Sequence, residues 1–432
     1  MGTAVDSFKR DGNQSPRTSA DDRLLDAATH IAACHGYSQL TVERVLGMAG
    51  VSRATFYQYF SNVDDCFWSA YSRHAEQLVS DVSAAARRGR DAELAVLEAL
   101  VAIALSRPHI ARLLMHEGLA AGPRGPVERD ALISKLEQAM TRAAPLRSVI
   151  DLPAGILIGA TFRFLSMRLS EDAGVAGLCD DVRAWALTFT HPPSRTSWSS
   201  RLFREVPRPR SAEAIQSSRA RPRGSPSGRP RERILRATAA TIREKGYQAV
   251  TVADIVGAAG VSRRTFYNEF SSKADAFIAT YEQGFQQTLA ACTPAFFTPR
   301  AWPERVWHSA RAFTQLMVRE PLIAYLGFVE CYALGPSFAR RVHDTQLAFT
   351  LFLEDGYRQR AEAHSLSHAY SALTAAAIFE AGFQASLCGP SHNIWRFQPL
   401  AVYVALAPFI GVDEAGEFVE GKLSGGLPRA RM

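Results

Sequence analysis

Apolar residues recur at helical spacing in two separate stretches of the chain. Positions i, i+3, i+4 and i+7 are filled by Leu24, Ala27, Ala28 and Ile31 in the first stretch and, more loosely, by Leu235, Thr238, Ala239 and Ile242 in the second. Gly36 and Gly246 follow, as glycine commonly does just past a helix end. Thr41 and Thr251 can each cap a second helix, and a third short helix is predicted over 53–60 and 263–270. Two short helices joined by a turn and preceded by a packing helix are typical of a helix-turn-helix.

The two stretches are copies of one another. Residues 23–71 align with 233–281 without a gap, and about 21 of 49 positions are identical. A weaker match joins 107–123 to 320–336. A repeat of this length indicates a duplicated unit of about 200 residues, whose second part has diverged more than its first.

The repeat sets the predicted organisation, which is an all-helical chain of two tandem units, each with a three-helix head and a larger helical body. Pro, Ser and Arg dominate between the copies, which favours a mobile, basic linker; that its arginines also touch DNA is the other possibility. The predicted parts are a disordered tail at 1–20, a head at 21–71, a body at 72–190, the linker at 191–230, a head at 231–281, a body at 282–415 and a C-terminal tail at 416–432.

The third helix of each copy has two kinds of residue. Phe56 and Phe60, like Phe266 and Phe270, are four apart and are expected to anchor it to neighbouring helices. The open face is expected to carry Arg53, Ala54, Thr55, Tyr57 and Gln58 in the first copy and Arg263, Arg264, Thr265, Tyr267 and Asn268 in the second. Arg, Gln and Asn can pair with base edges, while Tyr and Thr hydroxyls suit phosphate oxygens. Because this face recurs after the same turn, we favour DNA contact over a plain solvated surface.

The blocks GVSRATFYQYF and GVSRRTFYNEF resemble the recognition segment of the tetracycline-repressor (TetR) family, and the flanking GYxxxTV and FSxKxxxF patterns agree. The resemblance implies a transcriptional regulator whose body binds a small effector and dimerises through its last two helices. It also implies phosphate contacts by Thr41 and Tyr57 and by Thr251, Tyr267 and Lys273. The first copy departs from the pattern, because Val63 stands where the lysine is expected.

Charge separates the two heads. The whole chain carries a net +7, while residues 23–71 carry three basic and four acidic groups and residues 233–281 carry seven and four. Since phosphate neutralisation supplies much of the affinity for DNA, the second head is expected to contribute more of it. The first head then reads a weaker half-site or is partly vestigial, and we favour two working heads.

Each body ends in apolar helices rich in small residues, at 152–169 and 181–189 in the first and at 368–387 and 399–410 in the second. They occupy the place of the family's dimerisation pair. We expect them to pack against each other within one chain, giving a covalent pseudo-dimer on an imperfect palindromic operator. A homodimer with four heads is the alternative.

Aromatic residues crowd the second body and form either a core or a pocket for an apolar or aromatic effector. The candidate ligand-binding residues are Trp307, Phe313, Tyr325, Phe328, Glu330, Phe379 and Phe383. Glu117 and Glu330 match across the copies, and we favour a structural role for them over contact with a cationic ligand.

Other classes of protein are not favoured. The six cysteines form no CxxC pair and, by their spacing, have no nearby His partner, which argues against a disulfide framework and a zinc site. Sequence signatures of catalysis and of cofactor binding are lacking, as is an apolar run of membrane-spanning length or a secretory signal. We therefore expect a ligand-responsive repressor in the cytoplasm, with no catalytic residues, metal or cofactor. The alternatives are an activator, or a ligand- or partner-binding protein with weakened DNA binding.

Overall fold

The computed structural model describes residues 19–143, 150–170, 177–191, 197–202, 228–387 and 394–424. Within these ranges every extended regular element is a helix, and one isolated β-bridge joins Ile150 to Thr190. The predicted all-helical class is confirmed. Most of the predicted N-terminal tail and of the linker at 191–230 lies outside the described residues.

The first unit runs from the N-terminal head into its body. Its helices are α1 (Ala20–His35), α2 (Val42–Ala49), α3 (Arg53–Tyr59), α4 (Val63–Arg88), α5 (Ala92–Ser106), α6 (Pro108–Arg112), α7 (Gly118–Ala120), α8 (Gly125–Ala143), α9 (Ala154–Ser170) and α10 (Leu178–Leu187). A 3-10 turn, η1 (Tyr37–Gln39), follows α1, and a π-helical turn, η2 (Leu113–Glu117), joins α6 to α7.

The second unit repeats this plan after a short helix, α11 (Trp198–Leu202). Its helices are α13 (Pro230–Lys245), α14 (Val252–Ala259), α15 (Arg263–Glu269), α16 (Lys273–Phe297), α17 (Trp302–Arg319), α18 (Pro321–Phe328), α19 (Pro336–Ala348), α20 (Ala369–Leu387), α21 (Ile394–Ile410) and α22 (Val412–Ser424). The 3-10 turns are η3 (Glu330–Tyr332), η4 (Phe349–Phe352), η5 (Glu354–Arg358) and η6 (Glu362–Ser365).

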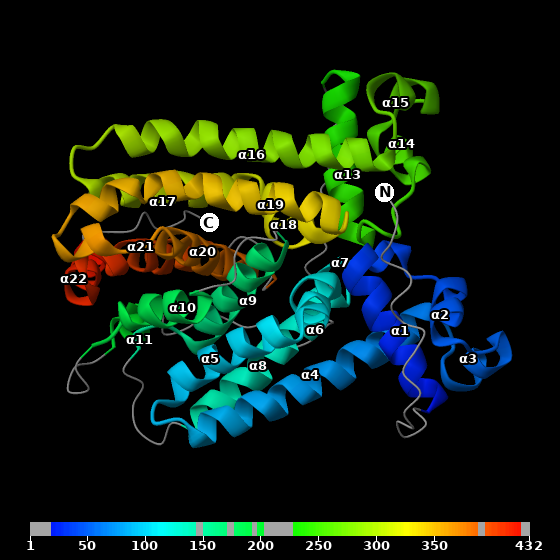
Figure 1. Ribbon diagram of the computed structural model, residues 1–432. Helices are drawn as coiled ribbons and strands as arrows, with labels where there is room; N and C mark the ends of the chain where they lie inside the picture. Colours follow the sequence, from blue (N-terminus) through cyan, green and yellow to red (C-terminus); the bar gives the residue numbers. More distant parts are fainter. Residues whose placement is uncertain are drawn as a thin grey trace, which may run out of the picture.

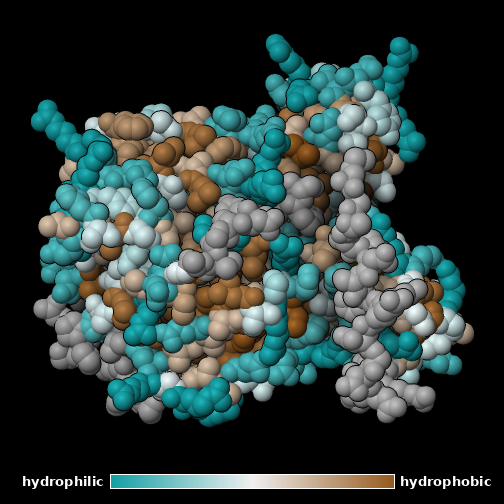
Figure 2. Space-filling model, viewed as in Figure 1, coloured by the Kyte–Doolittle hydropathy of each residue, from teal (hydrophilic) through white to brown (hydrophobic). Residues whose placement is uncertain are grey.

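A long helix leaves each head and runs along its body, α4 in the first unit and α16 in the second (Figure 1). The helices stack from α16 through α17, α21 and α20 to α9, and on to α5 and α4. Both heads, α1–α3 and α13–α15, lie on the same side of the stacked bodies, and the outward face of the second is mostly hydrophilic (Figure 2). The bodies thus hold two recognition helices on one side of a single chain.

The two units meet where α9 packs along α20, as predicted for the ends of the bodies. Gly159 makes this approach possible, because a Cβ there would lie 2.4 Å from Cδ of Glu380. Trp185 on α10 adds a hydrogen bond from its indole nitrogen to Oγ1 of Thr374 on α20, at 3.1 Å. The ends of the two bodies therefore contact each other within the chain.

A buried ion network crosses this contact. Glu380 accepts two hydrogen bonds from Arg129 on α8, at 2.9 and 2.8 Å, and one from Nε of Arg163 on α9, at 2.8 Å. All three side chains are almost fully excluded from solvent. Burial alone would raise the pKa of Glu380, but the two guanidinium groups hold it at about 2. Glu380 is therefore a carboxylate that bridges the units.

The end of the chain differs from the prediction. A tail was expected from residue 416, but α22 continues to Ser424 and Val419 is fully buried. Val412, Ala415 and Val419 form the apolar stripe that packs it against α21. Trp198 of α11, from the predicted linker, lies on Gly416, where a Cβ would come within 2.1 Å of its ring. Part of the linker and part of the tail therefore pack on each other.

Within the described residues no single helix is both long and apolar enough to cross a membrane. The helical segments Ala92–Ser106 and Pro108–Ala120 together reach that length and apolar composition, but they are bent by 114° relative to each other.

We expect Glu380→Gln to destabilise the chain strongly. The amide cannot balance Arg129 and Arg163, and breaking a buried ion pair costs about 3–5 kcal/mol. Urea denaturation followed by circular dichroism measures this. The matched control is Glu282→Gln, which removes an exposed pair with Arg341 and is expected to cost about 1 kcal/mol or less. Equal stabilities of the two variants would contradict the bridging role.

Candidate nucleic-acid interface

The turn between the last two head helices is built the same way in both units. Gly50 and Gly260 adopt left-handed backbone conformations, with φ of 64° and 61°, where a side chain would be strained. Ser52 and Ser262 then cap the next helix by accepting the backbone N–H of Thr55 and Thr265, both at 3.0 Å. The turn therefore fixes the direction in which α3 and α15 leave it.

An arginine that the sequence analysis did not single out holds this turn from the first helix. Arg23 donates to the carbonyl of Ala49 at 3.2 Å, and Arg233 donates to those of Ala259 and Gly260 at 3.0 and 2.7 Å. The sequence offered a signal for this role, because arginine stands at this position in both copies.

The predicted anchors lie on the inner face of each recognition helix. Phe56 and Phe266 are fully buried, and Phe60 and Phe270 pack beside them with ring centroids 5.8 and 5.9 Å apart in the two pairs. The other face is open. Its exposed members are Arg53, Ala54, Tyr57 and Gln58 in the first head and Arg263, Arg264, Tyr267 and Asn268 in the second, while Thr55 and Thr265 are half-buried.

The two open faces differ in available positive charge. Arg53 forms an ion pair with Glu43 on α2, and both side chains are more than half exposed. The corresponding position in the second head, 253, is alanine, so Arg263 does not face the same carboxylate. The second recognition helix therefore presents two arginines where the first presents one that is already paired.

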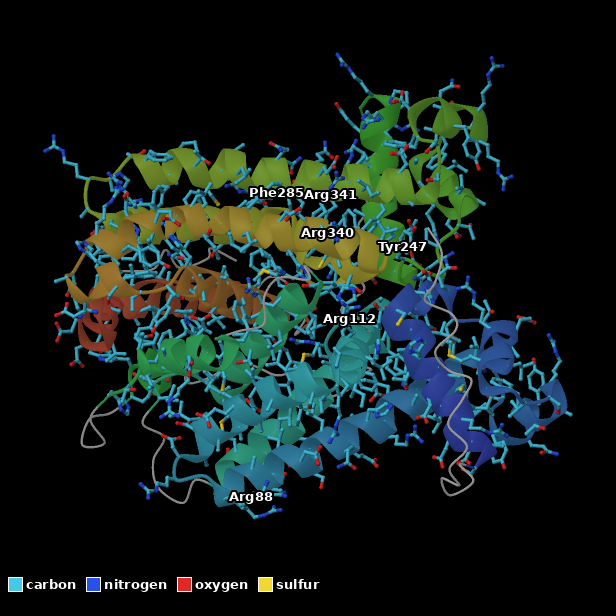
Figure 3. All side chains as sticks on the ribbon, viewed as in Figure 1. Arg88, Arg112, Tyr247, Phe285, Arg340 and Arg341 are labelled. Carbon is cyan, nitrogen blue, oxygen red and sulfur yellow. The ribbon has the colours of Figure 1, made fainter. Side chains whose placement is uncertain are left out.

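The residues that the TetR resemblance assigns to phosphate contact lie in two environments. Thr41 and Thr251 are exposed at helix N-termini, where their hydroxyls already accept backbone N–H groups. The ammonium of Lys273 instead donates to the carbonyls of Tyr247 and Val250, both at 2.8 Å, and lies 4.3 Å from the centre of the Tyr247 ring (Figure 3). Phosphate contact by these side chains stays a prediction.

A buried glutamate joins the first body to its head. Oε2 of Glu117, in η2, accepts the backbone N–H of Tyr37 at 2.7 Å, just past the end of α1. Burial raises the pKa of Glu117 to about 7, against the opposing effects of this hydrogen bond and of Arg112 (Figure 3). His116 lies 3.7 Å from its other oxygen. These contacts agree with the structural role that we favour for Glu117 over contact with a cationic ligand.

Glu330 has a comparable place in the second unit. It is buried, lies close to Gly246 at the end of α13, and accepts a hydrogen bond from the Tyr325 hydroxyl at 3.3 Å. Each body thus places a buried carboxyl against the turn that follows the first head helix.

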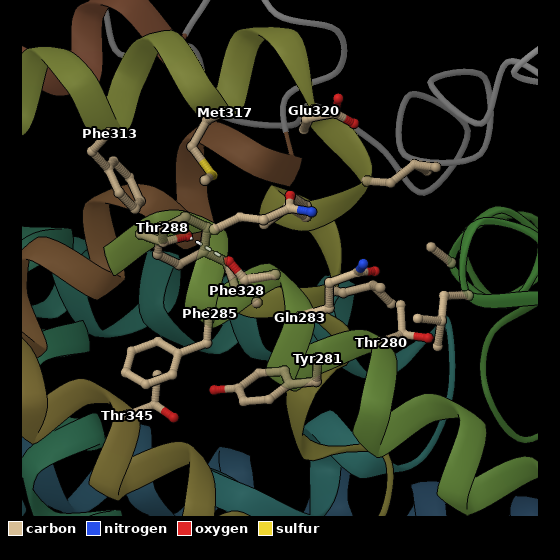
Figure 4. A pocket seen from close by; sticks show the side chains of 18 of the residues that line it. Thr280, Tyr281, Gln283, Phe285, Thr288, Phe313, Met317, Glu320, Phe328 and Thr345 are labelled. Atoms are coloured by element: carbon tan, nitrogen blue, oxygen red, sulfur yellow. Dashed lines mark hydrogen bonds between the residues drawn. The ribbon is translucent and has the colours of Figure 1, made fainter. Parts of the chain in front are cut away.

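Two adjoining cavities open in the second body. The first, seen from close by in Figure 4, has a volume of about 120 Å³. Its lining includes Leu235, Arg236 and Ala239 of the head helix α13. The second, about 100 Å³, is lined almost wholly by apolar side chains. Four aromatic residues line both: Phe313, Phe328, Phe349 and Phe379.

Three of the seven candidate ligand residues lie at these cavities, namely Phe313, Phe328 and Phe379. The other four lie elsewhere. Trp307 packs near Phe418, Tyr325 and Glu330 contact each other, and Phe383 lies beneath the guanidinium groups of Arg129 and Arg163. The sequence showed which body is aromatic but not which rings border empty space, because that depends on helix packing.

The structure brings together a His/Cys group that the sequence analysis did not expect. His30 and Cys34 on α1 lie beside His109 on α6, and their ligand atoms are all within 4.8 Å of one another. The expectation that no histidine lies near a cysteine was wrong for Cys34. The spacing of His30 and Cys34, one helical turn apart, was the missed signal.

Comparisons with known proteins agree with the head geometry. The family model described as bacterial regulatory proteins of the tetR family matches residues 24–69 and 234–280. The chain is similar to the HTH-type transcriptional activator FasR of Mycolicibacterium smegmatis, with 34% identity over 82 residues, 19% of this chain and 37% of that protein.

Two further relatives match over shorter segments. The putative mycofactocin biosynthesis transcriptional regulator MftR of Mycobacterium tuberculosis is 27% identical over 62 residues, 14% of this chain and 31% of its own length. The HTH-type transcriptional regulator CymR of Pseudomonas putida is 38% identical over 55 residues, which make up 13% of this chain and 27% of its own length. This chain spans about a third of the length of these relatives. The predicted resemblance to the TetR family is confirmed for both copies.

We expect Glu117→Gln to reduce the pH dependence of stability. Glu117 has a pKa of about 7 in the folded chain and about 4.5 in the unfolded chain. The folded state then binds more protons between these values, so stability falls as the pH rises through this window. Glutamine cannot ionise, so the free energy of unfolding should fall less between about pH 5 and about pH 8 in the variant than in the wild type. Urea denaturation at the two pH values measures this difference. Glu98→Gln, at an exposed pair with Arg183, should keep the wild-type loss; an unchanged loss in Glu117→Gln would contradict the assignment.

Proposed function

Two TetR-like units stand in tandem in this chain, and we propose that the protein is a transcriptional regulator that reads one imperfect palindromic operator with its two unlike heads. The observation that carries the proposal is the pair of exposed recognition helices on one side of a single chain. A helix-turn-helix dimer normally reads two half-sites about 34 Å apart, in successive major grooves. One chain of this kind acts as a pseudo-dimer in the cytoplasm, with its α9–α20 contact in place of a subunit interface.

The heads contribute unequally to the affinity. Arg263 and Arg264 are the basic residues of the second recognition helix, while Arg53 in the first is paired with Glu43. Since counterion release scales with the number of phosphates neutralised, the second head supplies more of the salt-dependent term. Arg264 faces one half-site where Ala54 faces the other, so the two half-sites differ in sequence.

A small effector controls the spacing of the heads in this proposal. The cavity of about 120 Å³ supports it, because α13 of the second head forms part of its wall. A ligand that prefers one position of α13 shifts the population toward that head spacing. The simplest outcome is repression by occupancy of the operator, which the ligand releases. FasR is named an activator, and whether this chain represses or activates depends on where its operator lies.

A second candidate function rests on a specific observation. Arg53 and Lys273 are both already engaged, by Glu43 and by backbone carbonyls. A protein that kept its effector or partner site but no longer bound DNA would show the same contacts at these two positions. Binding measurements on DNA separate the two.

We expect Arg263→Ala to weaken specific DNA binding about 5- to 150-fold, because a base-edge contact by arginine contributes about 1–3 kcal/mol. Tyr267→Phe, which removes only the hydroxyl, is expected to weaken binding evenly across sequences. The measurement is a mobility shift at several salt concentrations on fragments selected by the purified protein. A shift unchanged in both variants would assign binding to the basic linker.

A matched pair of charge changes gives the control. Glu43→Ala frees Arg53 and is expected to tighten binding, while Ala253→Glu places the same carboxylate beneath Arg263 and is expected to weaken it. Both substitutions change exposed positions, one on α2 of the first head and one on α14 of the second. Neither should therefore change the free energy of unfolding by more than about 0.5 kcal/mol. Opposite or absent effects on DNA would contradict the unequal contribution of the heads.

We expect a single-ring apolar compound such as toluene to raise the melting temperature of the chain. Engineered apolar cavities of about 150 Å³ bind benzene, and the two cavities here are of similar size. Ala310→Phe fills the second cavity and should reduce the rise to what the first cavity contributes, whereas Leu105→Phe, at an exposed position of the first unit, should leave the rise unchanged. The same rise in all three proteins would place the compound elsewhere.

A further inference from the structure

Two histidines and a cysteine converge where the first head meets its body. Sγ of Cys34 lies 3.7 Å from Nε2 of His30 and 3.7 Å from Nδ1 of His109. The two imidazole rings lie with their centroids 5.1 Å apart. All three side chains are exposed, so an ion can reach them from solvent.

The two sulfur–nitrogen distances match edges of a tetrahedral zinc site. Zinc binds cysteine sulfur at about 2.3 Å and histidine nitrogen at about 2.0–2.1 Å. At a tetrahedral angle, these bond lengths put sulfur and nitrogen about 3.6 Å apart, close to the 3.7 Å found for both pairs. All three ligand atoms lie within 4.8 Å of one another, so side-chain rotations can bring them onto one ion.

The donor set also selects the kind of ion. One thiolate and two imidazoles suit Zn²⁺ and its borderline-soft neighbours, whereas Mg²⁺ and Ca²⁺ prefer oxygen. We propose that His30, Cys34 and His109 form a zinc site, with water as the fourth ligand. The site needs no residue of the recognition helices or of the cavities in the second body.

The position of this site gives it a mechanical consequence. His30 and Cys34 belong to the first helix of the head, and His109 belongs to α6 of the body. An ion bound to all three ties the head to the body at the end of α1. The Glu117–Tyr37 hydrogen bond joins body and head close to the same helix end. Zinc therefore restricts how the first head moves relative to its body.

The second unit lacks these ligands. The corresponding positions carry Ala240, Glu244 and Leu322. Its body contains the two aromatic cavities instead. The duplicated units therefore present two different inputs: a metal ion at the first head and an apolar molecule in the second body.

The test uses the full chain with its thiols reduced and Zn²⁺ or Co²⁺ added alone. We expect one Zn²⁺ per chain by calorimetry, and a thiolate-to-metal charge-transfer band with Co²⁺ that Zn²⁺ removes. Losing an outer-shell partner of a metal ligand costs about 10–100-fold in affinity, so Cys34→Ser and His109→Ala, which remove ligands, should each weaken Zn²⁺ binding at least about 100-fold.

Matched controls separate this site from other thiols and histidines. Cys179→Ser changes a partly exposed cysteine on α10, and His364→Ala changes an exposed histidine in η6. Both should keep the wild-type affinity and band. The proposal is overturned if wild type binds no Zn²⁺, if the band survives Cys34→Ser, or if His30→Ala and His109→Ala leave the affinity unchanged. These readouts involve no DNA, so their failure is distinct from failure of the proposed regulator function.

Discussion

The carboxylate of Glu380 is the group on which the arrangement of the two units depends. It comes from α20 of the second unit and is bound by Arg129 and Arg163 of the first. A buried charge without such partners would be costly, so the units are favoured in the one register that brings all three together. Gly159 leaves the space that this register requires. The relative position of the heads therefore depends on a contact between the two bodies.

Duplication within one chain has allowed the two units to diverge in chemistry while keeping one plan. The turns, caps and phenylalanine anchors are the same in both heads, because they fix the geometry of the recognition helix. The residues on the open faces differ, as do the body residues around α6 and α18. The two subunits of a symmetric homodimer cannot diverge from each other in this way.

The sequence predicted the parts of the structure that depend on local patterns. The head helices, their capping serines and the buried Phe56 and Phe266 follow from spacing within a few residues. The Glu380 network and the His30–Cys34–His109 group were not predicted, since each joins residues far apart in the chain. The helix after residue 416 was missed because its apolar stripe gains meaning only when α11 and α21 are in place.

The most direct test of the account is the stoichiometry of the protein–DNA complex. Sedimentation equilibrium of the full chain with a selected operator duplex gives the number of chains bound, and hydroxyl-radical footprinting gives the grooves protected. The account predicts one chain per duplex, with two unequal protected segments one helical turn apart on the same face. Two chains per duplex, or one protected segment, would contradict a single chain that reads both half-sites.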